Sequence, residues 1–226
     1  MNVRVPLSQP LASPAEEPAI SEPLRLAVIA AVRWAWALVR EQARVDPMAA
    51  GEEAITNELE RLLNERVAGA RRAPGLKLFE TVHRSAQQRA AGSSFRQSPD
   101  LTFRPKAVPS SVIDQSAWAL FAECKVIARP SCPPRLYCED GVQRFADGRY
   151  APKMANALMV AYVRDGSTPL PTLRPHLADK FGTREVRAGT GDEWLAHSVH
   201  DRGGNPVPCV AIEIAHVWLD ARSPSP

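Results

Sequence analysis

The distribution of apolar and polar residues over the first part of the chain predicts a tail followed by two helices. Residues 1–22 are rich in proline and show neither a helical nor a strand period, so we expect a flexible arm. Residues 23–46 carry apolar side chains at helical spacing and predict an amphipathic helix that begins after Ser21 and ends before Pro47. Its apolar run is interrupted by Arg33 and is shorter than the ~20 residues that cross a bilayer. The sequence therefore predicts no membrane contact.

Basic residues gather on one side of this first helix. At 100° per residue, four of them share a face: Arg25, Arg33, Arg40 and Arg44. We expect the apolar sides to pack on the core, or on a second copy of the chain or a partner protein. The alternative is that the basic side lies along the phosphates of a nucleic acid.

The second predicted helix spans residues 51–67 and carries a narrower apolar stripe. That stripe consists of Ile55, Leu59, Leu62 and Leu63. Glu52 lies near its centre, where an acid is costly unless it is paired or close to a metal ion. The alternative is that Glu52 stabilises the helix as a first-turn acid, through the helix dipole.

Two stretches connect this helix to the middle of the chain. Residues 76–84 are predicted to open a β-sheet. Residues 85–98 are polar and arginine-rich, and include Arg96. They are predicted to form a loop, either over a substrate groove or as a solvated connection.

The clearest strand pattern covers residues 118–127. Its side chains alternate between two faces, and both faces are apolar except at Glu123 and Lys125. A strand that is apolar on both faces is a central strand, covered on both sides. Burying a carboxylate and an ammonium there costs several kcal/mol even when they are paired, so a site explains them better than stability does.

A second acid precedes a short strand. Pro99 and Asp100 stand before Leu101, and proline restricts the backbone ahead of it, which can set the approach of the aspartate. Asp100 and Glu123 offer the hard oxygen ligands that Mg²⁺ prefers, together with water and phosphate. A metal ion there lowers the pKa of a bound water, and Lys125 orients that water or stabilises developing charge.

With these residues the chain resembles the PD-(D/E)xK nuclease superfamily, which has the restriction-endonuclease-like fold. The resemblance rests on Pro99-Asp100 and on Glu123-Cys124-Lys125. It implies that Asp100, Glu123 and Lys125 are catalytic and that Mg²⁺, or Mn²⁺ in its place, is the cofactor. It also implies an acid from the upstream helix as a third metal ligand; Glu52 is our choice, with Glu58 and Glu80 as alternatives.

The segment after the lysine resembles a run found in bacterial nuclease-like proteins of this superfamily. The matching residues are Arg144, Phe145, Gly148, Tyr150, Met154, Ala157, Met159, Tyr162 and Val163. The resemblance implies helices that cover the active face. The polar candidates for contact with phosphate or water are Gln143, Arg144, Arg149 and Lys153. Of these, Arg144, Arg149 and Lys153 are expected to bind nucleic acid, together with Arg96 from the upstream loop.

The remaining patterns predict two further strands. Residues 194–202 and 209–220 alternate, with two glycines between them for a turn. His200 and Arg202 either face the substrate or have a structural role, and structural histidines are the commoner case. Residues 221–226 are predicted to be a second tail.

Composition adds little about partners but limits the compartment. The 226 residues suit one domain with extensions, and the net charge of +3 is small, although most of the 28 basic residues are arginine, which binds phosphate well. A GC-rich genome would also give many arginines. The four cysteines form no CxxC pair, and the N-terminus lacks a signal-peptide core, so we expect a cytoplasmic protein with reduced thiols.

Together these observations predict an α/β protein with a restriction-endonuclease-like core, a mixed central sheet flanked by helices. The nuclease-like domain covers residues 47–220, after an N-terminal helix at residues 23–46. The predicted function is a Mg²⁺-dependent endonuclease, with DNA favoured over RNA, and by analogy a role in defence against foreign DNA. The alternative is a subunit that keeps the fold and binds nucleic acid or a partner without catalysis.

Overall fold

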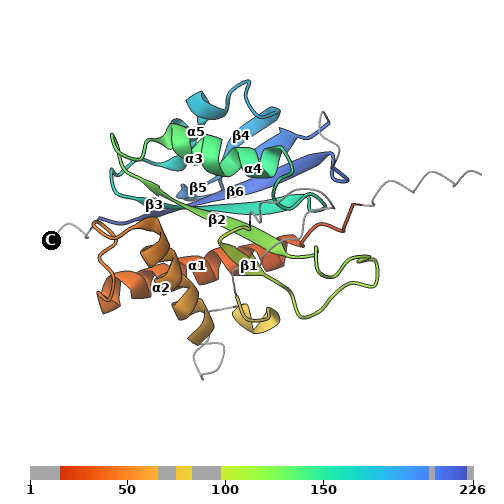
Figure 1. Cartoon of the computed structure of the whole chain (residues 1–226), viewed down its shortest axis with the longest axis horizontal. Coiled ribbons are helices and arrows are strands. Elements are labelled where there is room, and N and C mark those ends of the chain that lie inside the picture. The colour runs from red at the N-terminus through yellow and green to blue at the C-terminus, as the bar shows by residue number, and fades with distance from the viewer. Residues whose placement is uncertain (1–15, 66–74, 83–97, 204–206, 223–226) are drawn as a thin grey trace, which may run out of the picture.

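A six-stranded mixed sheet forms the centre of the computed structural model, which describes residues 16–65, 75–82, 98–203 and 207–222 (Figure 1). The strand order is β1-β2-β3-β6-β5-β4. Neighbours β2, β3 and β6 run parallel, whereas the other pairings are antiparallel. The strands are β1 (Leu101–Phe103), β2 (Leu120–Ile127), β3 (Asn156–Val163), β4 (Thr183–Gly189), β5 (Asp192–Asp201) and β6 (Ala211–Asp220). The predicted α/β class with a mixed central sheet is confirmed.

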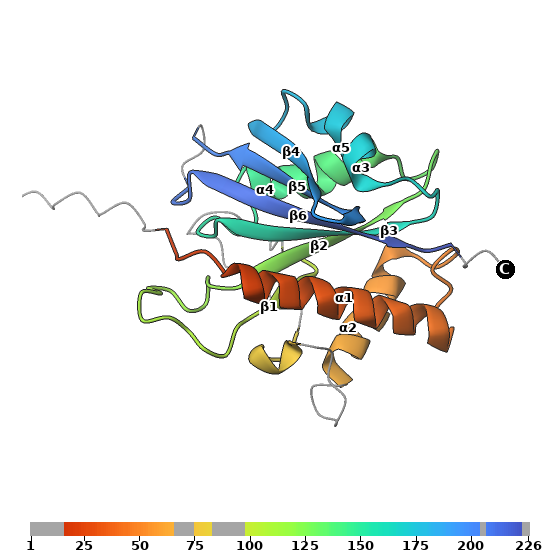
Figure 2. The same ribbon diagram turned by 180° about the vertical axis from the view of Figure 1, so that it is seen from behind.

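Helices cover both faces of this sheet, as Figures 1 and 2 show from opposite sides. One layer holds the two long helices α1 (Glu22–Gln42) and α2 (Glu52–Glu65), with the short 3₁₀ helix η1 (Leu76–Leu78) nearby. The other layer holds α3 (Pro134–Tyr137), the π-helical turn η2 (Cys138–Val142), α4 (Gln143–Ala146) and α5 (Pro169–Leu177). Two elements of the fold, helix α5 and strand β4, were not predicted from the sequence.

Helix α1 packs its apolar side on the sheet, which was one of the predicted alternatives. Its buried residues are Val28, Ile29, Ala31, Val32, Ala35, Trp36 and Val39. Its basic side is partly neutralised by the sheet, because Arg25 pairs with Glu213 at 2.5 Å and Arg33 pairs with Asp192. No helix among the described residues is long and apolar enough to cross a membrane.

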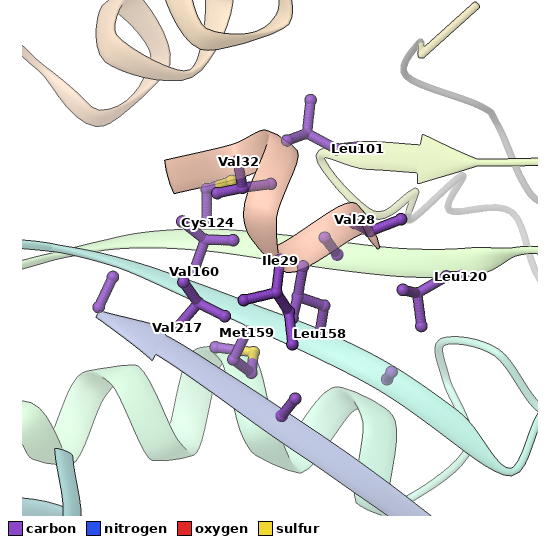
Figure 3. Close-up of a cluster of buried hydrophobic side chains, with 14 of the residues drawn as sticks. Val28, Ile29, Val32, Leu101, Leu120, Cys124, Leu158, Met159, Val160 and Val217 are labelled. Atoms are coloured by element: carbon purple, nitrogen blue, oxygen red, sulfur yellow. The ribbon is translucent and has the colours of Figure 1, made fainter. Parts of the chain in front are cut away.

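The hydrophobic core lies on both faces of the central strands, against α1 and α2 on one side and against α3, η2, α4 and α5 on the other. Figure 3 shows Val28, Ile29 and Val32 of α1 beside side chains of β1, β2 and β3. All eight residues of β3 are buried, and seven of the eight in β2 are. Such continuous burial is expected of parallel strands that are covered on both faces. The central-strand prediction for residues 118–127 is therefore confirmed, and so is the buried stripe of α2, whose four apolar residues are at most 2% exposed.

Two sequence predictions are wrong. Residues 76–84 were expected to open the sheet, but Leu76–Leu78 form a 3₁₀ helix and Phe79 makes only an isolated bridge to Pro105. Among the described residues the first strand is β1, and residues 83 and 84 lie outside them. The run from Arg144 to Val163 was expected to form helices, but residues 156–163 form strand β3. A strand that is apolar at every position has no period of its own, so helical spacing is present in it by default. The expected helical cover is shorter and ends with α4.

Strands β5 and β6 confirm the last two predicted strands and enclose a chain of buried polar groups. His216 Nδ1 lies 2.8 Å from the Tyr137 hydroxyl, and its Nε2 lies 2.8 Å from Ser198 Oγ. Ser198 Oγ lies 2.7 Å from Nε2 of His200, and Nδ1 of His200 lies 3.2 Å from the carbonyl oxygen of Phe181. His200 and His216 are completely buried. His200 thus does not face a substrate, and its role is structural.

We predict that the two buried histidines, His200 and His216, make the folded protein sensitive to acid. Burial lowers the pKa of His200 to about 4 and the pKa of His216 well below its ordinary value. Between pH ~6.5 and ~4 the unfolded chain binds these protons and the folded protein does not, so the free energy of unfolding falls as pH falls. The expected slope is about 1.4 kcal/mol per pH unit for each histidine.

Urea unfolding at several pH values tests this expectation. The variant His200→Gln should lose part of the slope below pH ~6.5, whereas His176→Gln on α5 should keep it. Equal slopes for the His200 variant and the wild type would contradict the prediction.

Candidate active site

The candidate site lies at the start of strand β1, beyond which one edge of β2 is open. Strand β1 pairs only with residues 120–122 of β2. Beyond them, side-chain carboxylates replace the missing strand. The Cys124 amide donates to Asp100 Oδ2 at 2.8 Å, and the Val126 amide donates to Glu52 Oε2 at 2.9 Å. Each acid therefore satisfies a backbone donor that would otherwise lack a partner in the ladder.

Asp100 reaches this position because of the strand register. Leu101 pairs with Ala122 in an antiparallel register, so Asp100, one residue before Leu101, falls opposite Glu123. Glu123 and Lys125 are two residues apart on β2 and therefore project to the same face, the one covered by η2 and α4. Four of the predicted residues, Asp100, Glu123, Lys125 and Glu52, are thus brought together.

The ammonium of Lys125 is held by three acceptors. Its Nζ lies 3.0 Å from Glu123 Oε1, 2.9 Å from Glu52 Oε1 and 2.9 Å from the Cys124 carbonyl. An ammonium has three N–H donors, so these contacts account for all of them. Burial opposes the charge, but Glu123 and Glu52 outweigh it and raise the pKa of Lys125. Lys125 is therefore a fixed cation at neutral pH and not a proton acceptor.

Glu123 is the most buried acid of the site, at 2% exposed. Its Oε1 accepts from Lys125 and from Arg144 Nη1, the latter at 2.8 Å. Its Oε2 is buried and has no hydrogen-bond partner among the residues that the structure describes. Burial, followed by the negative charge of Asp100, raises the pKa of Glu123 to about 7, against the opposing influence of Lys125 and Arg144.

Arg144 comes from α4 and connects Glu123 to Tyr150. Its Nη1 donates to the Tyr150 hydroxyl at 2.9 Å, and its guanidinium carbon lies 5.6 Å from the centre of that ring. The sequence singled out Arg144, but Tyr150 was taken only as part of a resemblance. The chemical role of Tyr150 was missed, because the six-residue spacing between the two carries no regular pattern.

The buried guanidinium of Arg202 holds the segment that carries Arg144 through hydrogen bonds to its backbone carbonyls. Arg202 is 1% exposed and donates to the backbone carbonyls of Phe145, Tyr150, Ala151 and Met154. Burial lowers its pKa to about 10, so it remains charged. Arg202 was expected to face a substrate as one alternative; it lies instead beneath the site segment as a structural clamp.

Gly141 in the π-helical turn η2 closes over the floor of the site. A Cβ at this position would lie 2.4 Å from the Met159 side chain and 3.7 Å from Lys125 Cγ. Only glycine allows this approach without displacing Met159. π-Helical turns are rare, and they are frequent at functional sites.

The donor set fits a divalent cation held by two carboxylates. Glu123 Oε2 is a buried oxygen without a partner among the described residues, and Asp100 is the acid that most affects Glu123. Mg²⁺ commonly takes one or two carboxylates and fills its other positions with water and phosphate. Glu52 has both oxygens engaged, and within the described ranges no group of three or more acid, histidine or cysteine side chains is arranged to hold a metal. The geometry thus gives Glu52 the role of holding Lys125.

The other predicted nucleic-acid contacts do not join this cluster. Arg149 pairs with Asp147 at 2.7 Å within its own turn, and Lys153 pairs with Asp114 at 2.8 Å. Arg96 lies outside the described residues. The two alternative acids also have other partners, since Glu58 pairs with Arg61 at 2.5 Å and Glu80 with Arg104 at 3.7 Å.

Comparisons of the chain with protein-family models, curated proteins and solved structures find no match.

We predict that Glu123 titrates near neutral pH in the metal-free protein. Its carboxyl ¹³C chemical shift should change with a midpoint of about 7. Asp100→Asn removes the neighbouring negative charge and should lower that midpoint, while the asparagine oxygen can still accept from the Cys124 amide. As an internal comparison, Glu213, whose pKa is lowered to about 2 by His197 and Arg25, should not titrate in the same range. A Glu123 midpoint near 4 in the wild type would contradict the prediction.

Proposed function

We propose that the protein is a Mg²⁺-dependent nuclease that hydrolyses phosphodiester bonds, with a core of the restriction-endonuclease-like kind. One observation carries the proposal. A buried carboxylate oxygen of Glu123 without a described partner lies beside Asp100, and a fully hydrogen-bonded cation, Lys125, stands on the same face. The resemblance of these residues to the nuclease superfamily supports the same function.

Each residue of the cluster has a definite part in this proposal. Asp100 and Glu123 would hold the metal ion, which supplies a water of lowered pKa and neutralises charge on the phosphate. Lys125, protonated and fixed by three acceptors, stabilises the extra negative charge of the pentacovalent phosphorus. Glu52 holds the ammonium in place from α2. Asp100 and Glu52 also keep the open edge of β2 in its extended form through the Cys124 and Val126 amides.

DNA is the substrate that we propose first, and defence against foreign DNA is the role that the resemblance suggests. A subunit that binds nucleic acid without cutting it is the alternative. Its sign would be binding that survives EDTA and Asp100→Asn, without cleavage under any metal condition.

The first test is cleavage of duplex DNA, single-stranded DNA and RNA by purified protein with Mg²⁺ or Mn²⁺. We expect cleavage that EDTA abolishes and that Lys125→Ala reduces by about 10²-fold or more, as expected for loss of a charge that stabilises the transition state. Lys180→Ala, which alters an exposed lysine far along the chain, should cleave like the wild type. Intact substrates under every metal condition would remove the nuclease proposal.

A second test separates the two roles that Glu52 can have. If it positions Lys125, Glu52→Gln should lower kcat and leave the Kd for Mg²⁺, measured by calorimetry, close to that of the wild type. If it is a metal ligand, the Kd for Mg²⁺ should rise instead, since a carboxylate is lost from the ion. We expect the first result, and Asp100→Asn should provide the matched case in which the Kd itself rises.

A further inference from the structure

Arg144 reaches from the buried acid of the candidate site to its solvent side. Its side chain is 27% exposed, whereas the side chain of its partner Glu123 is 3% exposed. The guanidinium therefore lies at the boundary between the buried carboxylate and water. Among the two cations that contact Glu123, it is the more exposed, because Lys125 is 17% exposed.

The hydrogen bonds of Arg144 leave part of its guanidinium for a ligand. Its bonds to Glu123 and Tyr150 both use Nη1. A guanidinium has five N–H donors in a fixed plane. The N–H groups of Nε and Nη2 make no hydrogen bond to the described residues, so they remain for a ligand. Two parallel donors of this kind match two oxygens of a phosphate. The three N–H groups of Lys125, in contrast, are already used by protein acceptors.

The position of Arg144 is also set in advance. Tyr150 is tied back to it twice, through the hydroxyl and through a backbone bond of 2.8 Å from the Tyr150 amide to the Arg144 carbonyl. Beneath them, Arg202 fixes four carbonyls of the same segment. A donor that is fixed before binding loses little conformational freedom when the ligand arrives.

We propose that Arg144 binds the phosphate of the substrate at the candidate site through Nε and Nη2, with Glu123 and Tyr150 holding Nη1. This inference rests on the proposed nuclease function and extends it: the residue recognises the backbone phosphate and not a base. Recognition at this point is therefore independent of nucleotide sequence.

The test measures binding of a fluorescent duplex oligonucleotide in Mg²⁺ over a range of salt concentrations. Lys125→Ala is the parent, because its slower cleavage leaves most of the probe intact during the measurement. Adding Arg144→Gln should weaken binding by about tenfold at moderate salt and reduce the slope of log K against log salt by about one, as expected for the loss of one phosphate contact. The matched control is Arg184→Gln, because Arg184 also pairs with one carboxylate, Asp201, but on strand β4 at the opposite edge of the sheet.

A second variant, Arg144→Lys, provides a test in case Arg144→Gln does not fold. Arg144→Lys keeps a charge beside Glu123 but loses the planar fork, so it should keep the salt slope and bind more weakly than arginine. Thermal unfolding shows whether each variant is folded. If Arg144→Gln does not fold, unchanged affinity of Arg144→Lys overturns the inference.

The outcomes distinguish this inference from the proposed function. An unchanged salt slope for folded Arg144→Gln, or an equal loss in Arg184→Gln, overturns the role of Arg144 even if the wild type cleaves nucleic acid. If the wild type neither binds nor cleaves DNA or RNA, the proposed function fails, and the role of Arg144 fails with it.

Discussion

The burial of one carboxylate, that of Glu123, is the constraint on which the candidate site depends. A buried carboxylate is costly unless cations and hydrogen bonds compensate it. Here two cations reach the same oxygen, one from β2 itself and one from α4. The compensation is uneven, because Oε2 has no partner among the described residues and Asp100 adds a second negative charge nearby. The fold therefore keeps this acid at a pKa of about 7, and a further cation would stabilise its charged form.

The short length of β1 creates the second condition for the site. Had β1 continued, its backbone would have occupied the amides of Cys124 and Val126. Because it begins at Leu101, those amides bind Asp100 and Glu52 instead. Two acids from separate elements are thereby brought to one edge of the central strand. The same contacts explain why Glu52, on a helix that packs against the other face, can reach Lys125 at all.

The sequence predicted those parts of the structure that depend on local patterns. Strand alternation identified β2 as central and placed Glu123 and Lys125 on one face, and apolar spacing identified α1 and the buried stripe of α2. It could not distinguish β3 from a helix, since a strand buried on both faces has apolar residues at every spacing. The sequence also could not predict that Arg144 pairs with Glu123. These residues are 21 positions apart, and their contact depends on how α4 packs against the sheet.

Charge balance links the structure of this site to the order in which ligands would bind. Three acids, Asp100, Glu123 and Glu52, face two cations, Lys125 and Arg144, so the fully ionised cluster carries an excess negative charge. That excess repels a phosphodiester. Protonation of Glu123 cancels it, but with a pKa of about 7 only about half of the molecules are protonated at pH 7. A divalent ion reverses the sign and favours the ionised form of Glu123. In a nuclease built on this cluster, the cation would therefore bind before the nucleic acid or together with it. Arg144 could then serve the phosphate without giving up its bond to Glu123, because that bond and the phosphate would use different nitrogens of one guanidinium.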